Sequence, residues 1–179
     1  MDEKAATVVA AIEHATRHMR TRTGGQESPP LDPTQAWSAH CSALFRETMR
    51  QISLRGRVHV PQIYTDECAN ANELGKRIQS HPNDWEMVSI KDAQSRANEG
   101  ALIVGSYINP NRGRMGHLAF IYPSVVHRAD PLVRDGNIHR NTKTGEIRAT
   151  SSYGAVPVQR AFGSFPAKWF RYRHYRSPR

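Results

Sequence analysis

Two residues that lie far apart in the sequence could together form a nucleophilic site. Cys41 lies in the stretch AWSAHCSALFRET (36–48), and His117 follows the glycine-rich turn NRGRMG and opens the run HLAFIY. A thiolate becomes an effective nucleophile when the N-terminus of a helix or a nearby imidazole stabilises it. If the fold brings the two side chains together, this pair predicts cysteine-dependent cleavage of an acyl bond.

A third polar side chain would orient the imidazole through its other ring nitrogen. Gln159 is the uncharged polar residue of VPVQRAF (156–162), which we predict to be a strand beside the one that begins at His117. His127, in YPSVVHRAD, is the alternative for this role. We therefore expect Gln159 to orient His117, with His127 as the competing candidate.

Cys41 also has simpler interpretations. It could be an inert buried thiol, one half of a disulfide with Cys68, or a metal ligand beside His40. Two cysteines make neither a disulfide scaffold nor a CxxC pair, and a metal site needs three or four ligands at set spacings. We expect neither a metal nor another cofactor.

The elements that must position these residues are helices first and strands afterwards. Asp32 and Pro33 mark the start of the cysteine helix, and we place Cys41 at or near that start, on an apolar face that runs to Ile52. Other helices are expected over 3–20, over 72–79, and from Ser89 to Gly100, and strands over 101–108, 117–122, 145–150, 156–162 and in the C-terminal tail. This order indicates an α+β domain with helices packed on an antiparallel sheet.

The chain divides by composition into two parts. Residues 1–31 form an N-terminal amphipathic helix followed by a Gly/Pro-rich linker, TRTGGQESPPLDP. Residues 32–179 are expected to form the catalytic domain, which ends in the basic and aromatic tail KWFRYRHYRSPR.

Charge and hydropathy restrict the partners. The 179 residues carry a formal net charge of +9, which favours polyanions such as nucleic acid, anionic lipid or an acidic cell wall. No run approaches the ~18 apolar residues of a membrane span, and the first residues do not resemble a signal peptide. We expect synthesis in the cytoplasm and delivery to the periplasm or cell wall by a secretion apparatus or lysis.

Several short stretches resemble a known family. HCSALF (40–45) resembles the Asp-Cys-Ser-Gly box of NlpC-type cell-wall peptidases, and MGHLAFIY (115–122) resembles their Gly-His strand. The segment 71–110 is similar to one in CHAP amidases of phage and secreted proteins. The resemblance covers about residues 36 to 165. His40 stands where the family has an acidic residue, and Ala43 where it has glycine.

The resemblance implies a papain-like fold that cleaves amide bonds in the stem peptides of peptidoglycan. It implies that Cys41 attacks the carbonyl, that His117 acts as base and then as acid, and that Gln159 orients His117. Backbone N–H groups at the helix start would hold the oxyanion. Such an enzyme would be an antibacterial effector or a lysin, and its producer would need a cognate immunity protein.

Two alternatives belong to other functional classes. One is a basic nucleic-acid-binding module, in which Arg residues of the tail contact phosphates and Trp169, Phe170, Tyr172 or Tyr175 stack on bases. The other keeps the Cys–His chemistry but acts on an amide of a host protein, as deamidases and transglutaminases do.

Overall fold

The computed structural model describes most of the chain. The described residues are 3–22, 33–56, 58–66, 69–111, 114, 116–124, 131–135, 138–140, 147–149 and 155–175. Their helices are α1 (Glu3–Arg22), α2 (Pro33–Gly56), α3 (Ala71–Ser80), α4 (Ile90–Asn98) and α5 (Val158–Phe162), with a 3-10 helix η1 (Gln62–Tyr64). Their strands are β1 (Trp85–Val88), β2 (Ile103–Tyr107), β3 (His117–Ile121), β4 (Leu132–Asp135), β5 (Ile138–Arg140), β6 (Ile147–Ala149), β7 (Val156–Pro157) and β8 (Lys168–Tyr172).

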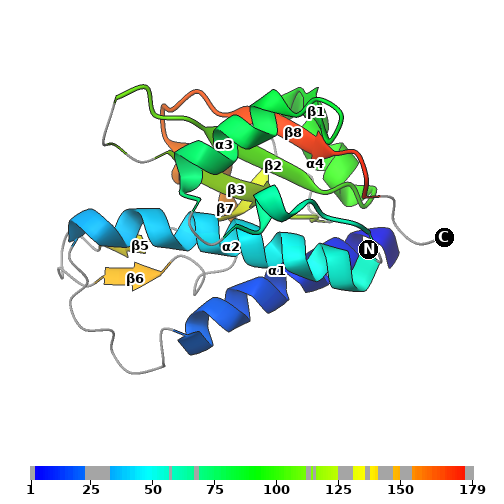
Figure 1. The fold of residues 1–179 in the computed structure, drawn as a ribbon, viewed down its shortest axis with the longest axis horizontal. Helices are drawn as coiled ribbons and strands as arrows, with labels where there is room; N and C mark the ends of the chain where they lie inside the picture. Colours follow the sequence, from blue (N-terminus) through cyan, green and yellow to red (C-terminus); the bar gives the residue numbers. More distant parts are fainter. Residues whose placement is uncertain are drawn as a thin grey trace.

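Six of these strands form one sheet in the order β1-β8-β2-β3-β4-β7, and every pair of neighbours in it is antiparallel. β5 and β6 pair separately as a two-stranded ribbon. The helices pack on the six-stranded sheet (Figure 1), so the α+β class expected from the order of elements is confirmed.

The sheet has an apolar cluster on each face, because successive side chains of a strand point to opposite sides. Leu118 and Phe120 of β3 belong to the large cluster, whereas Ala119 and Ile121 belong to the small cluster. The buried members of the large cluster are Val8, Ala11, Ile12, Cys41, Phe45, Met49, Ile52, Tyr64, Ala69, Ala71, Leu74, Ile78, Trp85, Leu102, Val104, Leu118, Phe120, Phe170, Tyr172 and Tyr175. Those of the small cluster are Val88, Ala93, Ala97, Ile103, Tyr107, Ala119, Ile121, Val133, Val156, Ala161, Phe162 and Trp169.

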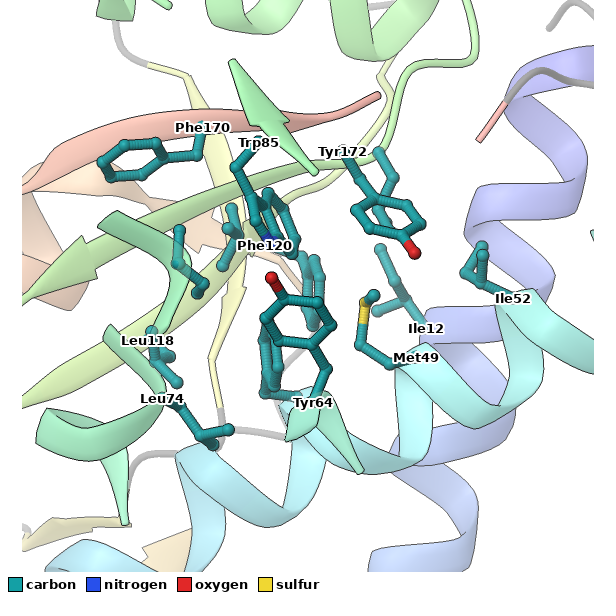
Figure 2. Packing of buried hydrophobic residues seen from close by; sticks show 14 of the residues in the cluster. Ile12, Met49, Ile52, Tyr64, Leu74, Trp85, Leu118, Phe120, Phe170 and Tyr172 are labelled. Carbon is teal, nitrogen blue, oxygen red and sulfur yellow. The ribbon is translucent and has the colours of Figure 1, made fainter. Parts of the chain in front are cut away.

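The large cluster joins the two long helices to the sheet. α1 packs along α2, and α2 lies against β3 (Figure 1). Ile12 and Met49 project from these helices towards Trp85, Tyr172 and other side chains of the sheet (Figure 2). A salt bridge of 2.6 Å from Arg134 Nη2 to Glu13 Oε1 further ties α1 to β4. The N-terminal helix therefore shares the core of the residues that follow it.

α3 begins at Ala71, one residue before the expected start, and α4 follows the predicted start at Ser89. Asn70 caps α3 by accepting a hydrogen bond from the Glu73 N–H, and the Glu73 side chain accepts one from the Asn70 N–H. Ser89 caps α4 by accepting from the Asp92 N–H. Gly100 follows α4 with φ 90°, a left-handed conformation that glycine adopts without steric cost.

The expected strand over 156–162 is wrong beyond Pro157. Only Val156 and Pro157 pair with β4, and residues 158–162 form α5. Pro157 has no N–H for a sheet ladder and occupies the N-cap of this helix with φ −57° and ψ 146°. Gly163 then ends α5 with φ 58°. Gln159 therefore lies on a short helix and not on a strand beside β3.

Two strands of the sheet were not expected, and one expected strand pairs elsewhere. β1 and β4 fall in segments for which we predicted no strand. The stretch 145–150 does contain a strand, but this strand, β6, pairs with β5 rather than with the six-stranded sheet. The strand expected in the C-terminal tail is confirmed as β8, which lies between β1 and β2.

Candidate functional site

Cys41 lies inside a helix and inside the core. α2 begins at Pro33, more than two turns before Cys41. The expectation that Cys41 lies at the helix start is therefore wrong, because the dipole effect is confined to the first turn and only the first four N–H groups are left without a helical partner. The free thiol is 1% exposed and belongs to the large cluster. Its surroundings are those of a buried apolar side chain.

His117 is the first residue of β3, as predicted, and its backbone lies opposite Tyr107 of β2. The imidazole is 8% exposed. Its ring centroid lies 4.9 Å from that of Phe162 on α5, at an interplanar angle of 63°. Phe162 comes this close to the sheet because Gly105 has no side chain, and a Cβ there would lie 3.0 Å from Phe162 Cζ. His117 thus faces the small cluster.

The structure does not bring the thiol and the imidazole together. Cys41 packs in the large cluster with Leu118 and Phe120, whereas the ring of His117 lies against Phe162 of the small cluster. The two side chains therefore lie on opposite faces of the sheet. What they share is the strand itself, since α2 packs against β3.

Gly116 has a definite steric role beside His117. A Cβ at Gly116 would lie 2.5 Å from the carbonyl oxygen of Tyr107 and would collide with the side-chain oxygen of Asn72. That amide holds the turn before β3, because Asn72 Nδ2 donates to the Arg114 carbonyl and Asn72 Oδ1 accepts from the Asn109 N–H, both at 2.8 Å. The side chain that approaches Gly116 closely is therefore Asn72 of α3.

Of the two candidates for orienting His117, Gln159 lies among the described residues and His127 does not. The side chain of Gln159 is exposed on α5, one turn before Phe162, and Phe162 is the residue of that helix whose ring contacts His117. His127, and Cys68 with any disulfide it could form, lie outside the described residues.

A cluster of polar side chains around Asp84, beside the edge strand β1, was not predicted. Asp84, just before β1, accepts hydrogen bonds from the Tyr64 hydroxyl and from His174 Nε2, both at 2.8 Å. Burial, followed by the bond to Asp84, raises the pKa of Tyr64 well above its usual value of 10. Burial likewise raises the pKa of Tyr172, whose hydroxyl donates to the His59 carbonyl at 3.3 Å. Sequence spacing gave no signal for this group, because its members come from distant segments.

An aromatic pair near His117, one buried ring and one exposed ring, was also not predicted from the sequence. Phe165 stacks on Tyr107 with ring centroids 4.5 Å apart and an interplanar angle of 17°. Phe165 remains 53% exposed. In the sequence this place is marked by the segment AFGSF, in which Gly163 and Ser164 separate two phenylalanines.

The described residues contain no group of three or more His, Cys, Asp or Glu side chains that could hold a metal ion. Their helices include none that is both long and apolar enough to cross a membrane.

Comparison with known proteins adds no family to these observations. Neither a protein-family model nor a curated protein matches the chain.

Proposed function

We propose that the chain is a papain-like cysteine hydrolase that cleaves amide bonds in peptidoglycan stem peptides. The observation that carries the proposal is that α2, the helix with Cys41, packs against β3, the strand that begins with His117. This contact supports the relation between a cysteine helix and a histidine strand that the resemblance of HCSALF and MGHLAFIY implies.

The proposed reaction uses the side chains in two steps. His117 takes the thiol proton of Cys41 as the sulfur attacks the carbonyl carbon, and then gives that proton to the departing amine. A thioester remains on Cys41. Water, deprotonated by His117, attacks this thioester, and the acid product leaves as the thiol regains its proton. Gln159 remains the proposed orienting residue, from its place on α5.

The proposal includes a local change in α2, because the thiol is buried and faces away from the imidazole. If the turns of α2 before Cys41 unwind, Cys41 becomes the first helical residue, where unbonded N–H groups stabilise both thiolate and oxyanion. His117 is the first residue of β3, so the proposed opening has to carry the thiol around the end of that strand to reach the imidazole. We propose that binding of the wall selects this opened arrangement.

The nucleic-acid alternative loses the stacking residues on which it depended. Trp169, Phe170, Tyr172 and Tyr175 are all between 0% and 6% exposed and pack in the core. A base cannot stack on a ring that the protein already covers. The positive charge that remains fits an anionic cell wall as well as it fits nucleic acid.

The proposed activity also determines where the protein acts and what else it needs. Peptidoglycan lies outside the cytoplasm, so we propose delivery by a secretion apparatus or by lysis. A producer whose own wall is susceptible needs a cognate immunity protein that covers the site.

Mass spectrometry of muropeptides after digestion of purified peptidoglycan tests the proposal. The wild-type protein should release stem-peptide fragments with new amino termini, and Cys41→Ala and His117→Ala should each lower this release at least a hundredfold. Cys68→Ala and His59→Ala serve as matched controls that should keep wild-type activity, and circular dichroism verifies that each variant is folded.

Two results would overturn the proposal. One is release of fragments that is undiminished in both Cys41→Ala and His117→Ala. The other is Cys41-dependent release of ammonia from a protein substrate with none from peptidoglycan, which would favour the deamidase alternative.

A further inference from the structure

Phe165 exposes an aromatic ring that a neighbouring ring supports. One side of it stacks on Tyr107, which is itself 9% exposed, while Phe165 remains 53% exposed. An exposed aromatic ring leaves apolar surface in water, and covering that surface with a partner is favourable. Among the large hydrophobic residues that are exposed in the described structure, Phe165 is the one that stacks on another ring.

The backbone around Phe165 holds this ring in place. The Phe165 N–H donates to the Phe162 carbonyl at 3.0 Å, and the Ala167 N–H donates to the Phe165 carbonyl at 2.9 Å. Gly163 has φ 58°, and a Cβ at that position would meet nothing within 4 Å. A ring that is fixed before binding loses little conformational entropy when a ligand covers it.

The ring pair lies next to the imidazole of the proposed site. Tyr107 is opposite His117 in the register of β2 and β3, and Phe162, three residues before Phe165, contacts the His117 ring at 4.9 Å. The pair Tyr107 and Phe165 therefore forms an aromatic shelf beside His117, on the face of the small cluster.

We propose that this aromatic shelf binds a sugar ring of the glycan strand while the attached stem peptide reaches His117. The inference rests on the proposed function for its substrate. The face of an aromatic ring carries partial negative charge, and the C–H hydrogens on the apolar face of a pyranose carry partial positive charge, so the two surfaces attract as they exclude water.

The neighbours of the shelf favour a sugar over a nucleobase. Gly163, Ser164 and Pro166 flank Phe165 without charge, and Lys168 is the nearest cation along this described segment. A nucleic-acid strand needs several cations along its phosphates, whereas an N-acetylated sugar needs an apolar ring and neutral hydrogen-bonding groups.

Binding of a soluble β-1,4-linked N-acetylglucosamine tetramer, followed by calorimetry, tests the shelf. The unmodified protein serves as the parent, because the tetramer carries no stem peptide and the proposed hydrolase therefore has no bond in it to cut. Phe165→Ala should weaken binding at least tenfold, and Phe165→Tyr should restore it to within about twofold, because it keeps the ring. Met87→Ala is the matched control: Met87 is 69% exposed on the edge strand β1, and the variant should bind like the parent.

Three outcomes would overturn the shelf. They are equal binding by Phe165→Ala and the parent, no binding of the tetramer by the parent, and loss of oligonucleotide binding in Phe165→Ala with tetramer binding unchanged. If the protein binds the tetramer but cuts no peptidoglycan, the proposed hydrolase activity is wrong and sugar binding by the aromatic shelf is supported.

Discussion

The two faces of the sheet differ in how completely they exclude water. On the large-cluster face, Phe45, Trp85 and Tyr172 are at most 2% exposed, and Phe170 keeps 6% of its surface. On the small-cluster face, Tyr107 and Trp169 keep 9% and 6% of their surface. Phe165, which stacks on Tyr107 of that face, is 53% exposed.

The two residues of the proposed catalytic pair lie on different faces of the sheet. The Cys41 side chain is 1% exposed on the large-cluster face, and the His117 side chain is 8% exposed on the small-cluster face. If Cys41 is the proposed nucleophile, its burial protects it until substrate binds, because thiolates are oxidised and alkylated according to their exposure. We infer that the proposed reaction depends on moving the cysteine, while the histidine stays fixed.

Phe45→Ala should have the largest effect on stability. Phe45 stacks on Phe120 with ring centroids 5.6 Å apart and is fully buried, so its loss should lower the free energy of unfolding by ~3–5 kcal/mol. On the other face, Phe165→Ala should change it by less than about 0.5 kcal/mol. Urea denaturation measures both, and similar losses in the two variants would contradict the difference between the faces.

Gly116→Ala should have an intermediate effect that is concentrated near His117. The new methyl group collides with the Asn72 side chain and with the Tyr107 carbonyl, and such overpacking costs ~1–3 kcal/mol. Because β3 must shift at His117, peptidoglycan cleavage should fall more than the stability loss alone explains. Asn72→Ala, which removes the obstructing amide, should restore part of that activity in the double variant; wild-type stability and activity in Gly116→Ala would contradict this account.

The smallest effect should be a change in how stability depends on pH, and it comes from Tyr64 of the large cluster. The pKa of Tyr64 is raised, so above pH ~10 the unfolded chain loses the phenol proton that the native state keeps. Native protein then binds more protons, and stability should fall as pH rises through that range. Between pH 9 and 11, the urea midpoint should fall less in Tyr64→Phe than in the wild type. An equal fall in both would show that Tyr64 does not contribute.

Local signals predicted much of the fold. The apolar stripe of α1, the cap Ser89, and the alternation in β2 and β3 each depend on residues within a few positions of one another, which sequence displays directly. The prediction for segment 156–162 was wrong because its alternation resembles that of a strand. In the structure Pro157 and Gly163 instead mark the two ends of a short helix. β1 and β4 are four-residue strands, too short for their period to stand out.

The candidate site was less predictable, for a physical reason. Alternation shows that His117 shares a face with Ala119 and Ile121, but not which face α2 covers. That choice depends on how Phe45 packs on Phe120, a contact between distant segments. Likewise, the close contact between Gly116 and Asn72 joins two distant segments and could be found only in three dimensions.

The most direct test of the central claim is the rate at which iodoacetamide alkylates Cys41, followed by intact-protein mass spectrometry in a Cys68→Ser background. In the isolated protein the rate should be at least a hundredfold below that of a free cysteine, because the thiol is 1% exposed. Peptidoglycan fragments should accelerate alkylation at least tenfold, and His117→Ala should abolish that acceleration. Alkylation as fast as that of free cysteine, or a rate that neither the fragments nor His117→Ala changes, would contradict the account.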